Sequence, residues 1–215
     1  MPTDPWNHNI HYHSIALNAV PQHCRRTLDV GCGQGMLAQK LAQRCQEVIG
    51  IDLHGPTLTQ ARSACSGLNA KAAIAFIEGD ILTYPFPEDS FDFITSIATL
   101  HHLPLTRALA RFRDLLRPGG TLAIVGLYRT QSPVDYAWAA IAMPASRLLR
   151  RAHHFVETTA PLRDPQETLS EIKAASRAIL PGSVLQRRLL FRYSLLWQKP
   201  KSGCPFLTAS SQRAG

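Results

Sequence analysis

Glycines at every second position follow a short apolar segment near the start of this chain. The stretch reads Leu28-Asp-Val-Gly31-Cys-Gly33-Gln-Gly35, and a helical pattern comes next. Glycine lacks a Cβ atom and permits positive φ, so such a turn brings its backbone close to a ligand. The N–H groups that open the next helix are unpaired donors facing the same ligand. The stretch therefore predicts a nucleotide-type cofactor site at the carboxyl end of a parallel strand.

Composition limits the class of protein without fixing its partner. With 215 residues, 45% of them hydrophobic, the chain is most simply one domain with a full core. A net charge of +8 permits an acidic partner such as RNA or a membrane surface. The arginines of the second half, Arg192 among them, form no dense run, which favours a solvated face. Five cysteines without a CxxC pair indicate free thiols in a reducing cytosol.

Strand-like and helix-like segments alternate along the first 128 residues. Strands are expected over 25–31, 48–52, 74–77, 91–98 and 121–128, with helices over 34–45, from 55 onward and over 105–116. The last helix carries an apolar stripe of Leu105, Leu109, Phe112 and Leu116. Asp164-Pro165 with Glu167 predicts the start of a later helix, and runs 184–191 and 193–197 predict a closing strand pair. This alternation predicts an α/β fold with helices on both faces of a parallel sheet.

Three segments lie outside this alternation. Residues 1–23 are expected to cap the entrance of the domain, which itself spans 24–199. An insertion over about 129–163 carries the apolar run 136–143 and the basic Arg147, Arg150 and Arg151. We interpret it as a lid over the active site; a plain packing helix and a membrane-surface helix are the alternatives. The tail, 200–215, is expected to be disordered. No signal segment or membrane span is evident, so we expect a cytoplasmic protein.

Two acids help to decide which cofactor the glycine turn holds. A dinucleotide site needs G-x-G-x-x-G, and here the third glycine is misplaced at Gly35. Asp52 ends the second strand, 17 residues after Gly35, where a carboxylate can accept both ribose hydroxyls. Asp80 ends the third strand beside Ile81, where an adenine ring could lie flat. The combination favours an adenosine-containing cofactor.

At this point the sequence resembles the class I S-adenosylmethionine-dependent methyltransferases. The resemblance covers residues 25–128. Within the family, the sequence looks most like the small-molecule branch that includes quinone and lipid methyltransferases. It implies a Rossmann-like three-layer sandwich with a seven-stranded, mostly parallel sheet in the order 3-2-1-4-5-7-6, strand seven being antiparallel. The motifs that carry it are the glycine turn, Gly50-Ile-Asp52, Glu78-Gly-Asp80, Pro87-Glu-Asp-Ser-Phe-Asp92, Leu100-His-His-Leu103 and Leu116-Arg-Pro-Gly-Gly120.

The same resemblance implies roles for matching residues. Gly31, Cys32 and Gly33, together with Gly35, would form the turn at the methionine end of S-adenosylmethionine, and Asp29 would hold that turn in shape. The ribose would be bound by Asp52, with Leu53 beside the adenine. The adenine edge would be read by Asp80 and the Ile81 backbone, and Ile97 would contact the amino acid portion. From the N-terminal segment, Tyr12 or His11 would close over the cofactor carboxylate.

The chemistry of the acceptor is less constrained. His101 and His102 follow the fourth strand and are candidate general bases, although a structural turn is the alternative interpretation. Trp138, Met143, Phe155 and Leu162 favour a small apolar or aromatic acceptor. An RNA methyltransferase and a non-methylating relative that only binds the cofactor stay open as alternatives. The Asn-Pro-Pro-Tyr type motif for methylating amino groups of bases is missing after strand four. Cys204-Pro205 is similar to a motif of RNA cytosine methyltransferases, but it lies in the tail and not after strand four. We expect no metal, and a monomer or homodimer.

Overall fold

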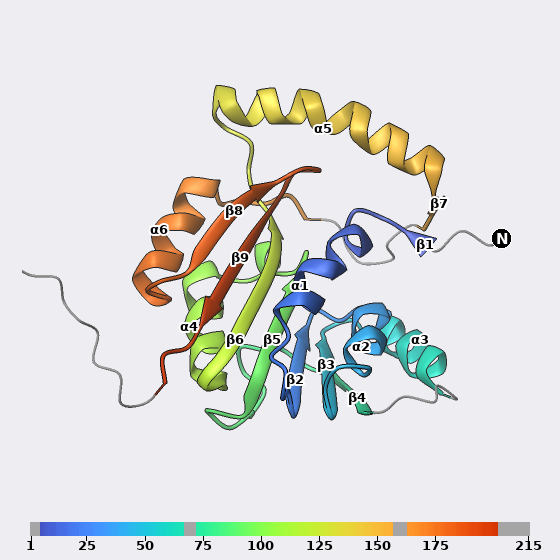
Figure 1. Cartoon of the computed structure of the whole chain (residues 1–215), viewed down its shortest axis with the longest axis vertical. Helices are drawn as coiled ribbons and strands as arrows, with labels where there is room; N and C mark the ends of the chain where they lie inside the picture. Colours follow the sequence, from blue (N-terminus) through green and yellow to red (C-terminus); the bar gives the residue numbers. More distant parts are fainter. Residues whose placement is uncertain (1–4, 67–71, 157–162, 202–215) are drawn as a thin grey trace, which may run out of the picture.

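A computed structural model describes residues 5–66, 72–156 and 163–201. Its centre is a seven-stranded sheet in the order β4-β3-β2-β5-β6-β9-β8, shown in Figure 1. Strands β2, β3, β4, β5 and β6 are parallel, while β9 pairs antiparallel with both β6 and β8. The strands are β2 (Arg26–Val30), β3 (Glu47–Asp52), β4 (Ala73–Glu78), β5 (Phe91–Ile97), β6 (Leu116–Leu127), β8 (Val184–Arg188) and β9 (Arg192–Gln198). Counted along the chain, this is the order 3-2-1-4-5-7-6, which confirms the predicted sheet.

Helices cover both faces of the sheet because neighbouring strand residues point to opposite sides. On one face, α1 (His13–Ala19) and α2 (Met36–Leu41) share a core with Phe93 and Ala123. On the other, α4 (Leu105–Leu115) and α6 (Leu169–Ile179) pack with Ile94 and Leu122. A further helix, α3 (Gly55–Cys65), packs beside β4. The predicted three-layer sandwich is therefore confirmed.

The helix–strand junction at residues 116–120 differs from the expected one. The apolar stripe of α4 is buried as predicted, at Leu109 and Phe112. However, β6 begins at Leu116, which pairs with Phe91, and not at Thr121. Gly119 and Gly120 then exchange backbone hydrogen bonds with Lys199. Strand pairing on both sides therefore extends β6 through a segment that the glycines and proline had marked as a turn.

The start of α6 was predicted four residues too early. Asp164 and Pro165 lie outside the helix, which begins at Leu169 behind the N-cap Thr168. The Thr168 hydroxyl accepts from the Glu171 backbone N–H, and the Glu171 carboxylate accepts from the Thr168 N–H over 2.7 Å. This reciprocal capping box satisfies two backbone donors at once, so it outweighs the simpler Asp-Pro signal.

One long helix stands apart from the sandwich. Figure 1 shows α5 (Pro133–Ala152) beyond the edge of the sheet, running from above β8 toward β7 (His154–Phe155). Its N-terminus is fixed by a capping box between Ser132 and Asp135, and Asp135 forms an ion pair with Arg187. No helix in the described ranges combines the length and apolar character needed to cross a bilayer.

The N-terminal segment joins the far end of α5 to the sandwich. It consists of β1 (Pro5–Trp6), the short helix η1 (Ile10–Tyr12) and α1. Strand β1 pairs in parallel with β7, and Trp6 stacks on His153 with ring centroids 5.8 Å apart. The segment and the insertion therefore form one cover at the edge where β6 ends.

Candidate functional site: a cavity at the carboxyl ends of the strands

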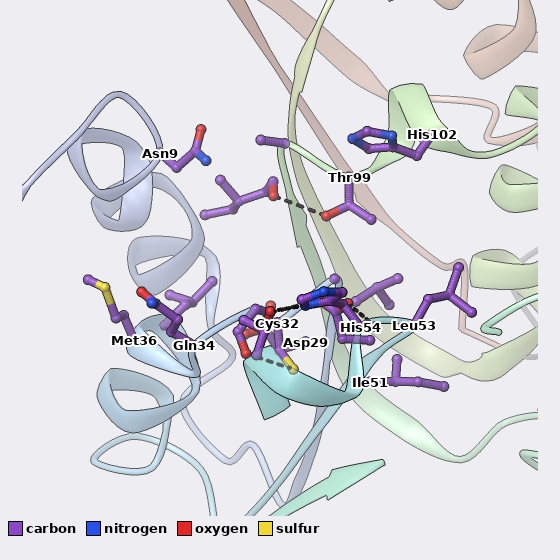
Figure 2. A pocket seen from close by; sticks show the side chains of 18 of the residues that line it. Asn9, Asp29, Cys32, Gln34, Met36, Ile51, Leu53, His54, Thr99 and His102 are labelled. Atoms are coloured by element: carbon purple, nitrogen blue, oxygen red, sulfur yellow. Dashed lines mark hydrogen bonds between the residues drawn. The ribbon is translucent and has the colours of Figure 1, made fainter. Parts of the chain in front are cut away.

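A cavity of about 310 Å³ opens where β2, β3 and β5 end. Its walls come from the turns after β2, β3, β4 and β5 and from the N-terminal segment. Figure 2 shows Asn9 of this segment on one side of the opening and His102, from the short helix η2 (Leu100–His102), on the other. The volume lies in the range of small-molecule sites, and the position is where open α/β sheets bind ligands.

The glycine turn has the backbone geometry that its sequence predicted. Gly31, Gly33 and Gly35 have φ of +71°, +50° and +75°, a region that suits residues without a Cβ atom. A Cβ on Gly31 would lie 2.0 Å from Oγ1 of Thr99. One on Gly33 would come no nearer than 3.9 Å to Thr57, so the Gly33 backbone faces open cavity. Gly35 is the N-cap of α2 and packs against Phe76 outside the cavity wall.

Asp52 ties this turn to the end of β3. One carboxylate oxygen accepts from the Gly33 N–H and the other from the His54 N–H, both over 2.9 Å. The Gly31 N–H also donates to the Ile51 carbonyl over 2.8 Å. Asp52 lines the cavity, so its carboxylate can orient the turn and contact a ligand at the same time.

Asp29 is a buried carboxyl group at the floor of the cavity. The residue is 2% exposed, and its Oδ2 has no hydrogen-bond partner among the described residues. Burial and the nearby charge of Asp52 raise the pKa of Asp29 to about 7. Buried polar atoms are normally paired, so an unpaired one at a cavity wall is suited to a cationic or hydrogen-bonding ligand. Its expected part in shaping the turn stays a prediction.

The far end of the cavity combines polar and apolar groups. Asp80 lines it and accepts from the Leu82 N–H over 2.9 Å. Ile81 is buried beside it, whereas Leu53 is 67% exposed at the rim. An apolar side chain left exposed at a cavity mouth offers a surface on which a flat ring can pack. Ile97 lines the wall at the end of β5.

The N-terminal segment contributes residues that sequence reasoning missed. Asn7, Asn9, Ile10 and His13 line the cavity, but Tyr12 does not. The Tyr12 ring is buried, and its hydroxyl donates to the Leu189 carbonyl over 2.6 Å. This polar, His-rich segment has no periodicity in its sequence, so the sequence gives no signal of which of its side chains face the cavity.

The two candidate bases differ in position. His102 lines the cavity, whereas His101 does not. The centroids of the two imidazole rings are 4.1 Å apart. Burial, together with the charges of His102 and Arg192, lowers the pKa of His101 to about 4. Burial and Arg163 also lower the pKa of His102. Both imidazoles are therefore neutral at pH 7, and His101 is a weak proton acceptor.

These groups fit an adenosine-containing sulfonium cofactor. One cavity is lined by the open backbone of Gly33, by the buried carboxyl of Asp29, unpaired among the described residues, and by Asp52 with its exposed neighbour Leu53. Hydroxyls, an ammonium group and a flat base are the partners that such a set can satisfy. The fold and the site therefore define an α/β enzyme of the nucleotide-cofactor class.

Comparisons with known proteins agree. Residues 28–124 match the model of the family described as a methyltransferase domain. The chain is 38% identical over 198 residues to an uncharacterized methyltransferase of Mycobacterium tuberculosis, which covers 91% of this chain and 98% of the relative. It is 35% identical over 126 residues to a demethylmenaquinone methyltransferase of Roseiflexus castenholzii, over 56% of this chain and 50% of the relative. A solved S-adenosylmethionine-dependent methyltransferase of Methanosarcina mazei has the same fold, with a TM-score of 0.60 and 20% identity over 92% of this chain and 99% of that one.

The chain belongs to the class I S-adenosylmethionine-dependent methyltransferases.

Proposed function

We propose that this methyltransferase acts on a small acceptor with an apolar or aromatic body. The observation that carries the proposal is an apolar cluster next to the cavity wall at Ile97. Trp6, Tyr12, Val125 and Leu190 form this cluster. Leu149 of α5, Phe155 of β7 and Ile97 itself pack against it. Ile97 both lines the cavity and packs against this cluster, so an apolar acceptor beside Ile97 would lie next to an apolar region of the protein.

The insertion around α5 is the proposed lid for that acceptor. Trp138 is 37% exposed, and Ile141 and Leu148 are more exposed still. These apolar side chains are left in contact with water, and closure of α5 over an apolar ligand would reduce that contact. Of the remaining residues expected to favour an apolar acceptor, Met143 is exposed and Leu162 lies outside the described residues.

We assign the cofactor contacts from the cavity wall. Asp52 would accept from the ribose hydroxyls, while Asp80 and the Ile81 backbone would contact the adenine and Leu53 would pack on it. The turn at Gly31, Cys32 and Gly33 would hold the methionine end, with Ile97 nearby. Asp29 would pair with the ammonium group, which would favour its ionised form. S-adenosylmethionine supplies a methyl group bound to a sulfonium.

Positioning is the main catalytic contribution that this site offers. Holding the acceptor in line with the methyl group lowers the barrier without any covalent participation of the protein. Closure by α5 and the N-terminal segment would exclude water. His102 faces the cavity and is better placed than His101 to take a proton, if the acceptor releases one. The named activity of the Roseiflexus relative supports a quinone-like ring as one acceptor to test.

The experiment that tests this proposal is an acceptor screen with radiolabelled S-adenosylmethionine. We expect label in an apolar or aromatic small molecule and release of S-adenosylhomocysteine. Transfer to RNA, with salt-sensitive RNA binding, would contradict the small-molecule proposal. Cofactor binding without release of S-adenosylhomocysteine under any condition would indicate a relative that does not methylate.

A further inference from the structure

Arg192 is a buried cation without an acidic partner in the described part of the chain. It opens β9 and is 8% exposed. Its Nη2 donates to Oδ1 of Asn9 over 2.9 Å and its Nη1 to the Leu190 carbonyl over 3.3 Å, while Nε has no partner among the residues that the structure describes. The ion pairs that the structure describes use other cations: Arg26, Arg113, Arg117, Arg129, Arg187 and Lys199. Arg192 therefore departs from the solvated arginine face expected from the sequence.

A buried guanidinium of this kind is costly for the fold alone. Charged groups removed from water are normally paired, because desolvation opposes the ionised form. Burial lowers the pKa of Arg192 to about 10, so it remains charged at neutral pH. Two neutral oxygens compensate only part of that charge. Such a cation is explained most simply by an anion that the site binds.

The turn that carries Arg192 is strained and firmly held. Leu190 and Phe191 have φ of +55° and +60°, which bulky residues rarely adopt. Leu190 is 1% exposed within the cluster of Trp6 and Tyr12, and the Tyr12 hydroxyl binds the Leu189 carbonyl. Backbone strain persists where the surroundings enforce it and is common at ligand sites. The N-terminal segment therefore fixes the position of Arg192.

Arg192 lies directly behind the cavity wall: it does not line the cavity itself, but its partner Asn9 does. Asn9, which holds its guanidinium, lines the cavity opposite His102 in Figure 2. The charge of Arg192 also lowers the pKa of His101, whose buried Nδ1 likewise has no partner within the described ranges. In the order β2-β5-β6-β9, β9 stands three strands from the glycine turn, roughly 14 Å at the usual strand spacing. The methionine end of the cofactor belongs at the turn, so a different anion is needed at Arg192.

We propose that Arg192, held by Asn9 and the strained turn before β9, binds a carboxylate or phosphate group of the methyl acceptor. This inference rests on the proposed small-molecule function and narrows it to an acceptor with an apolar body and an anionic end. The planar guanidinium of arginine matches both anions with paired hydrogen bonds, which lysine cannot reproduce.

A binding experiment tests the proposal without requiring turnover. Protein saturated with S-adenosylhomocysteine is titrated by calorimetry with phenylacetate and phenyl phosphate, and with neutral phenylacetamide and phenol. We expect at least one anion to bind saturably and Arg192→Gln to weaken it at least about 30-fold. Arg188→Gln is the matched control: Arg188 lies on the opposite strand of the same hairpin, but its guanidinium bonds only Ser194 and Gln186 among the described residues. Equal binding of the neutral compounds, or no anion binding, would overturn the proposal.

Two further readouts separate this role from others. Arg192→Gln should bind S-adenosylhomocysteine within about twofold of wild type, since loss of one anion contact should spare the other ligand. An equal loss of cofactor affinity would assign Arg192 to the cofactor carboxylate and contradict the proposal. Without ligand, Arg192→Met should melt no lower than wild type; a lower Tm would show a structural brace instead.

The outcomes also distinguish this inference from the proposed function. Anion binding at Arg192 without methyl transfer to any small molecule would contradict the function and leave the anion site standing. Methyl transfer to neutral acceptors alone, unaffected by Arg192→Gln, would support the function and overturn the anion site.

Discussion

The Asp52 carboxylate accepts a hydrogen bond from the Gly33 N–H over 2.9 Å, and thereby joins the end of β3 to the glycine turn after β2. The same carboxylate accepts from the His54 N–H. One side chain thus shapes the turn and lines the cavity. This double role makes Asp52 the residue on which cofactor binding should depend most strongly.

Asp52→Asn should weaken binding of S-adenosylhomocysteine by about 10- to 100-fold, because a hydrogen bond to a charged acceptor is replaced by a neutral one. Calorimetric titration measures the change. Glu88→Gln, an exposed change in the turn before β5, serves as the control and should bind like wild type. Wild-type affinity in Asp52→Asn would remove this residue from the proposed site.

Gly31→Ala should both destabilise the protein and abolish cofactor binding. The new Cβ atom would meet Oγ1 of Thr99 at 2.0 Å, and the backbone φ of +71° disfavours alanine. Gly182→Ala is a matched control, because Gly182 has a φ of +83° but no atom of the described residues lies within 4 Å of the added Cβ. Urea unfolding should show a loss of about 1–2 kcal/mol for the control and a larger loss for Gly31→Ala. Equal losses would mean that Thr99 moves aside freely.

The raised pKa of Asp29 predicts a pH dependence of defined sign. Between the ordinary pKa of 3.8 and about 7, folded Asp29 keeps a proton that the unfolded chain has lost. The stability of wild type relative to Asp29→Asn should therefore fall as pH rises from about 4 to about 7, and then level off. Urea unfolding of both proteins at pH 5 and pH 8 checks this. Parallel pH profiles would show that Asp29 titrates normally.

The same group should make cofactor binding depend on pH. If Asp29 pairs with the ammonium group of S-adenosylhomocysteine, affinity should rise as Asp29 ionises near pH 7. Asp29→Asn should bind more weakly and lose this dependence. Calorimetry at pH 6 and pH 8 provides the comparison. A wild-type pH dependence retained in Asp29→Asn would rule out the pairing.

The attachment of α5 can be tested through its arginines. Arg187→Ala removes the ion pair with Asp135 and a hydrogen bond to the Tyr128 hydroxyl, which together fix the start of the helix. Trypsin should then cleave faster after Arg147, Arg150 and Arg151. Arg177→Ala, an exposed change on α6, should leave cleavage unchanged. Equal cleavage rates in all three proteins would show that this contact does not restrain α5.

The sequence predicted the parts of the fold that local chemistry determines. Strong periodicity placed α4, and the spacing from Gly31 to Asp52 and Asp80 marked residues that the structure brings to one cavity. The predicted element boundaries were wrong where strand pairing overrides turn signals. At Leu116, for example, pairing with Phe91 starts β6 before the predicted Thr121. Thr168 and Glu171 have the spacing of a capping box, yet the Asp164-Pro165 pair predicts an earlier start of the helix.

The rest of the site depends on contacts distant in sequence. Asn9 lines the cavity in a segment that is held by the pairing of β1 with β7, nearly 150 residues later in the chain, and its side chain is bound by Arg192. Arg192 lies between Phe191 and Tyr193 at the edge of an apolar strand, and this was the one sign of its burial. The spread of arginines along the second half of the chain does not reveal the burial of Arg192, because composition does not show which side chain of a hairpin faces inward.

Calorimetric titration of S-adenosylmethionine into wild type and into the double variant Asp52→Asn/Asp80→Asn tests the assigned cofactor site most directly. Our account predicts a single saturable site in wild type and at least about 100-fold weaker binding in a folded double variant. Wild-type affinity in the double variant would place the cofactor elsewhere and contradict the account.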